Sequence, residues 1–479
     1  MQGCPALRGT KERRGNRPEP RFVYLVYSAL MTILAAALTP YWIIQGARHG
    51  KYFSNLRERL GFRFPALENL AAAKGKRTIW VHAVSVGEAL SSITLAKRLK
   101  EKFPESALVV STTTMTGHAV AREKMPFADA VIYFPLDWAF CVRRALQAVQ
   151  PGLVILVETE IWPNFLHECR KRGVAVMLVS GRISDGSFAR YRKLLAAFGM
   201  ALKPFLRRVL AEIDAFLMQS RQDVERITEL GAPESRIAVG GNLKYDLGTP
   251  EETPLSRWLQ TELQRSGRSP VIVAGSVVAT EEPLALIAFG VLQGEYPKAL
   301  LVLAPRKPER FEAAAEFIDE SNRKFVRRSA LAIPKPGSSE RTSSDARIGD
   351  ETTVLLLDSI GELASLYRLA DGVFVGGSLV ASGGHNILEP AAFGKIPVFG
   401  ESMENFAEMS RQFVESKAAI QVSSPEDAGV TWIELFRDTE RSRRMGEAAR
   451  RLVEESRGAT DRALETAARL LRQFSSESK

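Results

Sequence analysis

The stretch TIWVHAVSVGEALSSITLAKRLK, residues 78–100, joins the pattern of a buried strand to that of a helix. Residues Thr78–Val84 are almost continuously apolar, as in a strand of a parallel sheet that is covered on both faces. A turn follows over Ser85–Glu88, and Ala89–Lys100 carries apolar side chains at helical spacing. The stretch therefore predicts a strand, a turn and a helix in succession, which is the repeating unit of an open α/β sheet.

The same alternation continues along the chain after residue 75. The predicted strands are Thr78–Val84, Ala107–Thr113, Ala130–Phe134, Leu153–Val157, Val174–Ser180, Ala215–Gln219, Arg236–Gly240, Val271–Ala274, Ala299–Ala304, Thr353–Leu357, Gly372–Val375 and Ile396–Phe399. The stretch DLGTPEETPLS, residues 246–256, lacks periodicity and is predicted to be a linker. The polar residues 329–350 are predicted to be a surface insertion, and residues 428–471 an amphipathic helix pair that completes the fold. We therefore expect two Rossmann-like α/β domains, residues 51–246 and 247–479, that face each other across a cleft.

Composition places the chain among globular proteins with more than one domain. It has 479 residues, of which 45% are apolar and 25% are charged. Its three cysteines lack the spacing of a metal site and are too few for a disulfide framework, so we expect the main body to lie in a reducing compartment. The net charge is +10, but no basic-aromatic interleaving or recognition motif accompanies it, and we expect no nucleic-acid partner.

The first 50 residues are predicted to be a basic segment followed by a membrane anchor. Phe22–Ile44 is a run of 23 residues without a charged side chain, long enough to cross a bilayer. The alternatives are a cleaved signal peptide with its cleavage site at Ala35–Ala37, and a helix that lies in the membrane interface. The run continues past those alanines, which favours an uncleaved anchor. Together with the cysteine usage, the basic residues between Arg48 and Arg63 suggest a cytoplasmic body at the membrane surface.

Charged side chains follow several predicted strands of the first domain. Glu88 is either a helix-start residue stabilised by the helix dipole or a catalytic group, because ligands of open α/β sheets bind at the carboxyl ends of the strands. Glu158 and Glu160 follow the strand that ends at Val157, and Lys244 is a candidate to pair with Glu158 or to reach an anion. From the sequence alone, capping and surface ion pairing are the preferred explanation of Glu158, Glu160 and Lys244.

The second domain contains a segment with the features of a nucleotide site. GGSLVASGGHNILEPAAFGKIPVFG, residues 376–400, begins with paired glycines after a strand and leads into a helix predicted to start near Ile387. Such glycines allow close approach of backbone to a ligand, and helix-start N–H groups attract phosphate. Glu389 lies in the first helical turn and is placed to accept both hydroxyls of a ribose. Two other strand-end loops carry Arg306 and Glu362, for which surface ion pairing is the alternative.

Five of these motifs together resemble one enzyme family. HAVSVGEAL (82–90), ETEIWPN (158–164), GNLKYD (241–246), APRKPERF (304–311) and GGSLVASGGHNILEPAAFGKIPV (376–398) occur in the order found in the 3-deoxy-D-manno-octulosonic acid (Kdo) transferases of lipopolysaccharide assembly. The resemblance runs from the predicted anchor to at least Gly400. It favours the catalytic interpretation of Glu88.

The resemblance implies an inverting glycosyltransferase of GT-B architecture at the inner membrane, with CMP-Kdo as donor and a lipid A precursor as acceptor. It implies that Glu88 is the general base and that Glu158 and Lys244 support the transition state, although Glu160 is close enough to compete for that role. The segments that would hold CMP contain Pro305, Arg306, Ile360, Gly361, Glu362, Asn386, Ile387, Leu388 and Glu389. No aspartate-rich metal motif stands out, so we expect Arg306 and the helix start near Asn386 to stabilise the departing phosphate without a metal.

Two other functions remain open at this point. A nucleotide-sugar epimerase can share the architecture and a Gly-rich nucleotide loop. It needs neither a membrane anchor nor the basic residues that flank it, so these features count against it. A non-catalytic, membrane-tethered nucleotide-binding protein is the second alternative. The presence of Glu88, Glu158 and Lys244 together argues against it.

Overall fold

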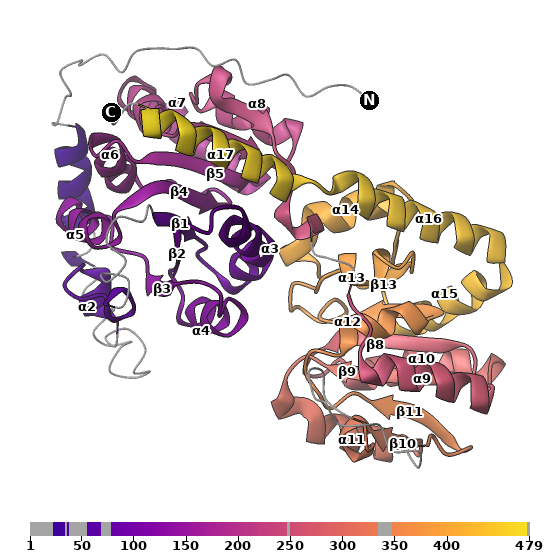
Figure 1. The fold of residues 1–479 in the computed structure, drawn as a ribbon. Helices are drawn as coiled ribbons and strands as arrows, with labels where there is room; N and C mark the ends of the chain where they lie inside the picture. The colour runs from indigo at the N-terminus through magenta and orange to yellow at the C-terminus, as the bar shows by residue number, and fades with distance from the viewer. Residues whose placement is uncertain are drawn as a thin grey trace. The chain divides into compact units, whose positions relative to one another are not determined.

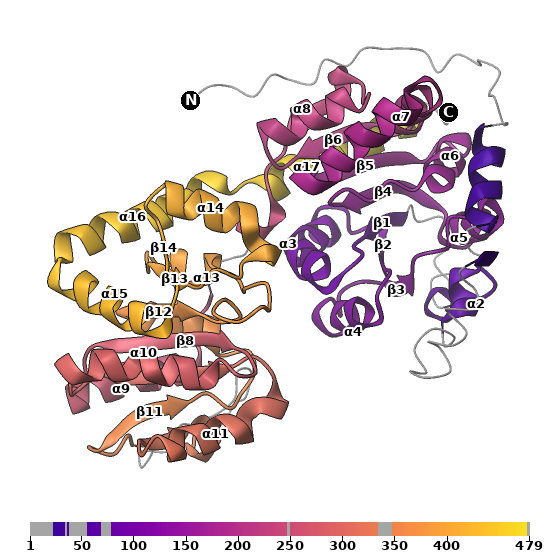
Figure 2. The ribbon, with the colours of Figure 1, turned by 180° about the vertical axis from the view of Figure 1, so that it is seen from behind.

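The computed structural model describes residues 23–33, 36–37, 55–68, 78–246, 250–333 and 347–476. The chain divides into two compact units, one formed by Met1–Leu247 with Ser456–Lys479 and the other by Gly248–Glu455. Figures 1 and 2 show the units from opposite sides, each with a central sheet between helices. Both sheets are parallel, so the fold has two Rossmann-like α/β domains, as the alternating pattern predicted.

The first sheet has seven parallel strands in the order β3-β2-β1-β4-β5-β6-β7. The strands are β1 (Thr78–His82), β2 (Ala107–Thr112), β3 (Ala130–Tyr133), β4 (Pro151–Val157), β5 (Ala175–Gly181), β6 (Ala215–Met218) and β7 (Ile237–Val239). The helices of this unit are α2 (Leu56–Arg59), η1 (Pro65–Leu67), α3 (Val86–Lys102), α4 (Met115–Lys124), α5 (Ala139–Val149), α6 (Pro163–Lys171), α7 (Asp185–Leu210), α8 (Arg221–Glu229), η3 (Glu234–Arg236), η4 (Leu243–Asp246) and α17 (Ala459–Ser476). The chain builds the sheet outward from β1 in one direction and then places β4 on the other side of β1. Ligands of such sheets bind beside this reversal, at the carboxyl ends of the strands.

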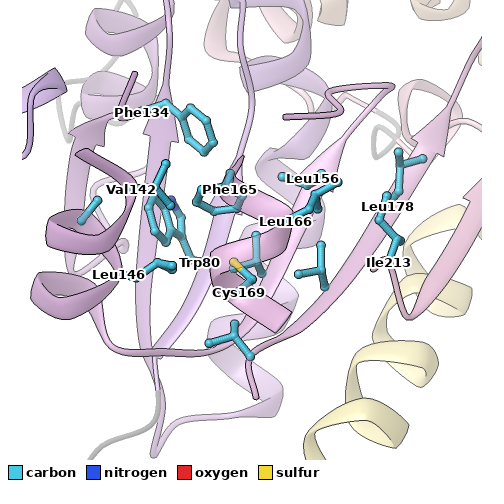
Figure 3. Packing of buried hydrophobic residues seen from close by; sticks show 14 of the residues in the cluster. Trp80, Phe134, Val142, Leu146, Leu156, Phe165, Leu166, Cys169, Leu178 and Ile213 are labelled. Atoms are coloured by element: carbon cyan, nitrogen blue, oxygen red, sulfur yellow. The ribbon is translucent and has the colours of Figure 1, made fainter. Parts of the chain in front are cut away.

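Apolar side chains cover both faces of the first sheet. On one face, Trp80 of β1 is fully buried and its ring lies edge-on to Phe165 of α6, with the ring centroids 5.3 Å apart. Figure 3 shows these rings with Phe134 and with aliphatic side chains of α5 and α6. The other face packs against α3, α4 and α17. Burial on both faces explains why the strands are continuous apolar runs in the sequence.

The last helix belongs to the first unit, which corrects the domain boundary expected from the sequence. The sequence places all of residues 247–479 in the second domain, whereas α17 packs on β4, β5 and α3 of the first. Figure 1 shows α17 in yellow beside β5. The buried side chains of α17 include Ala459, Ala463, Leu464, Ala467 and Leu470. The apolar stripe of a helix indicates that it is covered but not by which sheet, so the sequence alone could not assign α17 to a domain.

The second sheet also has seven parallel strands, in the order β10-β11-β9-β8-β12-β13-β14. The strands are β8 (Val271–Val277), β9 (Leu300–Pro305), β10 (Lys324–Arg327), β11 (Thr352–Leu356), β12 (Gly372–Val375), β13 (Pro397–Phe399) and β14 (Ile420–Gln421). The helices are α9 (Pro254–Ser266), α10 (Glu282–Glu295), η5 (Pro308–Arg310), α11 (Phe311–Glu320), η6 (Arg328–Ala330), α12 (Leu363–Leu366), η7 (Tyr367–Leu369), α13 (Leu388–Ala391), η8 (Glu404–Phe406), α14 (Ala407–Glu415), α15 (Pro425–Arg437) and α16 (Thr439–Ser456). Here the reversal lies between β8 and β12, so the Gly-rich segment after β12 begins where a ligand is expected.

The second unit differs from the sequence prediction at the edges of its sheet. The edge strands β10 and β14 were not predicted, because neither is a fully buried apolar run. The predicted helix start near Ile387 is confirmed, since Ile387 is the N-cap residue of α13, but this helix has only four residues. Its dipole is correspondingly small. Most of the predicted insertion, residues 334–346, lies outside the described residues, as do residues 247–249 of the predicted linker.

A helix covers residues 23–33 and 36–37, within the predicted anchor Phe22–Ile44. The rest of that run and of the first 50 residues lies outside the described ranges. In the part of the chain that is described, no helix combines the length and the apolar character needed to cross a membrane. One side of the helix packs on the body, where the Tyr24 hydroxyl donates to Glu212 Oε1 at 2.7 Å and the Tyr27 hydroxyl to Asp137 Oδ2 at 3.0 Å. The exposed side carries Leu25, Val26, Leu30 and Ile33.

Candidate active site

Glu88 lies in the first turn of α3, directly after β1. Its Oε2 accepts the N–H of Val84 at 2.8 Å, and its Oε1 accepts the hydroxyl of Ser85, the N-cap residue, at 2.8 Å. These bonds are those of a helix-start residue. The side chain is also buried, and burial raises its pKa, with a further increase from the charge of Glu158. A carboxylate with a raised pKa is suited to accept a proton, so the two interpretations of Glu88 are compatible.

Glu158 and Lys244 form an ion pair beside Glu88. Glu158 is the first residue after β4, and its φ of +59° is unusual for a residue other than glycine. Its Oε1 lies 3.4 Å from Nζ of Lys244, which belongs to the one-turn helix η4 after β7. The two charges act on Glu88 in opposite directions: Glu158 raises its pKa and Lys244 lowers it. The structure therefore brings together the three side chains predicted to be catalytic.

Glu160 belongs to the same cluster. Its Oε2 accepts the indole N–H of Trp162 at 3.1 Å. Burial raises the pKa of Glu160 to about 7, and the charges of Glu88 and Glu158 contribute to the increase. Three carboxyl groups and one amine thus share a small region at the reversal between β1 and β4. Clusters of titratable groups with shifted pKa values are typical of active sites.

Neighbouring strand-end loops hold this cluster in place. The hydroxyl of Thr159 donates to the carbonyl of Arg182, and the N–H of Arg182 donates back to Thr159 Oγ1 at 2.9 Å. These bonds join the loop after β4 to the loop after β5. On the other side, Asn242 Oδ1 accepts the N–H of Lys244 at 2.9 Å.

In the second unit, the charge of Arg306 changes the pKa values of two residues of the Gly-rich segment. Burial and the charge of Arg306 lower the pKa of His385 to about 4, so its imidazole is neutral near pH 7. Burial raises the pKa of Glu389, while a hydrogen bond from Asn386 and the charge of Arg306 lower it. Asn386 Nδ2 donates to Glu389 Oε1 at 3.3 Å. A cation, a neutral ring nitrogen and a carboxylate therefore gather at the strand ends, a combination suited to a phosphate and to sugar hydroxyls.

His385 and Glu281 are two site residues that the sequence did not select. His385 Nε2 is buried and has no hydrogen-bond partner among the described residues. Glu281 is fully buried, and its carboxylate accepts the N–H groups of Gly377 at 2.5 Å, Ser378 at 3.0 Å and Leu379 at 2.9 Å. Glu281 therefore fixes the start of the Gly-rich segment. Its partners lie about 100 residues further along the chain, so no local sequence pattern indicates this role.

The loop before α12 contains three predicted CMP-binding residues with different surroundings. Ile360 is exposed, and Gly361 has a φ of +91°, which favours glycine. Glu362 is fully buried. Its carboxylate accepts hydrogen bonds from the Nε–H group of Arg328, at 2.8 Å, and from the hydroxyl of Ser359. These contacts indicate that the side chain of Glu362 holds the loop from within, while the exposed part of the loop is at Ile360 and Gly361.

Three further residues predicted to hold CMP contribute little exposed side chain. Pro305 is the buried last residue of β9, and Ile387 and Leu388 are buried before and within α13. The N–H of Leu388 donates to Asn386 Oδ1 at 3.1 Å. Their side chains therefore shape the backbone that presents Arg306, Asn386 and Glu389.

Comparison with known proteins assigns the chain to a family. Residues 54–247 match the sequence model of the family described as 3-Deoxy-D-manno-octulosonic-acid transferase (kdotransferase). The 3-deoxy-D-manno-octulosonic acid transferase of Haemophilus influenzae is 33% identical over 443 residues, which are 92% of this chain and 96% of that protein. The chain belongs to the Kdo transferase family. It is thus a glycosyltransferase, and the two other functions left open by the sequence are not favoured.

A second relative agrees with this assignment, and a solved structure shares the fold. The 3-deoxy-D-manno-octulosonic acid transferase of Bordetella pertussis is 33% identical over 417 residues, or 85% of this chain and 89% of that protein. The solved structure of Anabaena HepE in complex with UDP has a TM-score of 0.50 at 11% identity and covers 82% of this chain and 99% of its own. At that identity the likeness concerns the fold alone.

Proposed function

We propose that this Kdo transferase moves Kdo from CMP-Kdo to a hydroxyl group of a lipid A precursor, with inversion at the anomeric carbon. The observation that carries the proposal is the meeting of Glu88, Glu158 and Lys244 at the reversal between β1 and β4. The two bacterial relatives are 3-deoxy-D-manno-octulosonic acid transferases, which supports Kdo as the transferred sugar, and the donor and acceptor follow from the resemblance of the five motifs.

In the proposed reaction Glu88 accepts the proton of the acceptor hydroxyl. The oxygen then forms a bond to the anomeric carbon of Kdo, while the bond from that carbon to the phosphate oxygen breaks and CMP leaves with the electron pair. A raised pKa makes Glu88 a better base than an exposed carboxylate at neutral pH. Lys244 and Glu158 set the charge around it. Burial raises the pKa of Glu88, and the charge of Lys244 opposes this effect in part.

CMP is proposed to bind at the strand ends of the second unit. Arg306 is exposed and meets the phosphate, and the N–H of neutral His385 donates to the same group. Glu389, held by Asn386, accepts the ribose hydroxyls. Because Arg306 and His385 meet the charge that develops on the leaving phosphate, we propose that transfer needs no catalytic metal. Turnover that is lost in a chelator and restored by a divalent cation would contradict this part.

The acceptor is proposed to be met at a membrane surface. A basic-apolar surface on the first unit is formed by Leu25, Val26, Leu30, Ile33, Phe62, Phe140, Arg57, Arg63 and Arg144. Contacts join the helix at residues 23–33 to α5, and α5 to the segment after α2. Thr32 accepts the indole N–H of Trp138 at 3.1 Å, Trp138 stacks with Phe140, and the guanidinium of Arg144 lies 4.4 Å from the ring centroid of Phe62. Exposed apolar residues beside arginines suit an interface of anionic lipids.

The test of the function is the product of a defined reaction. The full chain is incubated with CMP-Kdo and a lipid A precursor, and the product mass is compared with that formed by Glu88→Gln. The glutamine keeps an oxygen for the N–H of Val84, so the variant should fold and bind CMP normally. Its turnover should fall by about 10²–10⁴-fold, the usual effect of losing a positioned base. A wild-type chain that adds no Kdo, or a folded Glu88→Gln variant with near-normal turnover, would refute the proposal.

A further inference from the structure

The turn that carries Lys244 is fastened to the last helix of the chain. Asp246 lies two residues after Lys244 in η4, and its Oδ1 accepts the N–H of Gly458 at 2.7 Å. Its Oδ2 accepts the N–H of Thr460, in the first turn of α17. The carboxylate therefore acts as an N-cap for a helix more than 200 residues away in the sequence.

A second contact fastens the other end of the same motif. Nε of Arg462 in α17 donates to the carbonyl of Gly240 at 2.8 Å. Gly241 has a φ of +83°, and a Cβ at this position would lie 2.8 Å from Nη2 of Arg462. Leu243, between the two fastened ends, is buried in the same apolar cluster as α17. The segment from Gly240 to Asp246 is therefore held on α17 along its length.

Such support matters because the turn has little stability of its own. A 3₁₀ turn of four residues is short, and its hydrogen bonds have poor geometry. A lysine side chain is long and flexible, so the place of its amine depends on where its backbone is held. Lys244 Nζ lies 3.4 Å from Glu158, at a site where small displacements are expected to be costly.

We propose that Asp246 is a positioning residue for the transfer reaction, which holds Lys244 at Glu158 by binding the N-terminus of α17. The inference rests on the proposed role of Lys244. A purely structural role, in which Asp246 only caps α17, predicts lower stability with no specific link to Lys244. Double variants with Lys244 distinguish these two roles.

The experiment uses the full chain with four variants: Asp246→Ala, Lys244→Met, the double variant, and Asp461→Ala as control. Asp461 also lies in the first turn of α17, but its carboxylate pairs with exposed Arg98 at 2.6 Å. Asp246→Ala should lower kcat by about 10–100-fold, the range expected for misplacement of a catalytic group. CMP affinity should stay within about twofold of the wild type, since the CMP site lies in the other unit. Asp461→Ala should leave kcat unchanged.

In the Lys244→Met background, Asp246→Ala should change kcat by no more than about twofold, because the group that it positions is already absent. If Asp246→Ala lowers kcat by the same factor in the wild-type and the Lys244→Met backgrounds, the inference is overturned and Asp246 is only a structural cap. Normal kcat in folded Asp246→Ala would overturn it too. If Asp246→Ala does not fold, Asp246→Asn takes its place, since it keeps one of the two acceptors. Normal turnover in Lys244→Met alone would reject the proposed role of Lys244, a result distinct from failure at Asp246.

Discussion

The amine of Lys244 lies 3.4 Å from the carboxylate of Glu158, although 86 residues separate them in the sequence and they follow different strands. Between β4 and β7 the sheet contains two further strands, so the contact requires both strand-end loops to lean toward the same point. Glu158 does so with a φ of +59°. Backbone strain of this kind is typical of sites where a side chain must be aimed.

This pair gives the first prediction. Glu158→Gln and Lys244→Met should each lower kcat, by about 10²-fold if each supports charge in the transition state. The double variant should lose much less than the product of the two factors, because the residues act as a pair. Glu160→Gln is the comparison, since Glu160 is also an acid of this loop but accepts the indole N–H of Trp162. Kinetics of the four proteins decide the matter. A larger loss in Glu160→Gln than in Glu158→Gln would transfer the role to Glu160.

Glu160 gives a prediction for stability. Its pKa in the folded protein is about 7, above the ordinary 4.5, chiefly because of burial and also because of Glu88 and Glu158. Between these two values the folded state binds more protons than the unfolded state, so stability falls as pH rises. The loss is of the order of 1–3 kcal/mol and is complete above about pH 7. Glu160→Gln has no carboxyl group at this position, so this pH-dependent contribution to stability is absent. Urea unfolding should therefore show that the variant gains stability relative to wild type between pH 5 and pH 8, and a constant difference would contradict the shifted pKa.

The sequence was sufficient to place these residues at strand ends. Glu88 and Glu158 follow continuous apolar runs, and such runs become buried parallel strands whose carboxyl ends meet at one edge. The strand order, which makes β1 and β4 neighbours, is a property of the topology and is not visible in the local pattern. The meeting of Glu88 and Glu158 was thus an expectation from the family resemblance, and the fold supplies its physical reason.

Residues with distant partners could not be predicted in the same way. Glu281 and Asp246 accept backbone N–H groups about 100 and more than 200 residues away, and nothing near them in the sequence indicates these bonds. Tyr27 counted as part of an uncharged run, yet its hydroxyl is bonded to Asp137. Hydropathy is averaged along the chain. It therefore does not reveal that one side of an apolar, uncharged helix carries hydroxyl groups that can form hydrogen bonds.

Glu362 gives the third prediction, which concerns folding more than binding. Its carboxylate and the guanidinium of Arg328 are both buried and form two hydrogen bonds. Removing one partner of a buried pair leaves an uncompensated charge and costs about 3–5 kcal/mol. Glu362→Ala should therefore lower the free energy of unfolding by about this amount. The double change Arg328→Met and Glu362→Leu should cost much less. Denaturant melts of the isolated proteins measure both. An unchanged melting curve for Glu362→Ala, together with lost CMP affinity, would show that this side chain binds CMP instead of supporting the loop.

Arg306 gives the fourth prediction. Arg306→Ala should weaken CMP binding by about 1–3 kcal/mol, the expected effect of losing a charge-assisted hydrogen bond. Lys307→Ala is the control, because Lys307 is the adjacent residue, is also exposed and carries the same charge. If the effect arises from a specific contact, only Arg306→Ala weakens binding. Calorimetry with CMP at two salt concentrations distinguishes a contact from general attraction, which would affect both variants and weaken with salt.

The fifth prediction concerns the helix at residues 23–33. Leu30 and Ile33 are 61% and 66% exposed on the side away from the body, and each side chain that enters the apolar part of a membrane contributes about 1 kcal/mol or more. Leu30→Ser with Ile33→Ser should therefore lower binding to anionic vesicles by at least about tenfold. Ile287→Ser with Val430→Ser is the control, because these exposed apolar residues belong to α10 and α15 of the second unit. CMP binding should be normal in both double variants.

The arginines of the same surface separate electrostatic from apolar binding. Neutralising Arg57 and Arg63, which are exposed, should weaken vesicle binding at low salt and leave it nearly unchanged at high salt. Arg59 belongs to the body instead: its guanidinium lies 5.0 Å from the ring centroid of Tyr133, it donates to the carbonyl of Thr113, and burial lowers its pKa. Arg59→Gln should therefore lower the free energy of unfolding and change the affinity for vesicles little. Sedimentation with vesicles of defined anionic content measures each variant. If the Leu30 and Ile33 changes leave sedimentation unaltered while the Ile287 and Val430 changes abolish it, the membrane is met by the second unit and the surface assigned to the first is wrong.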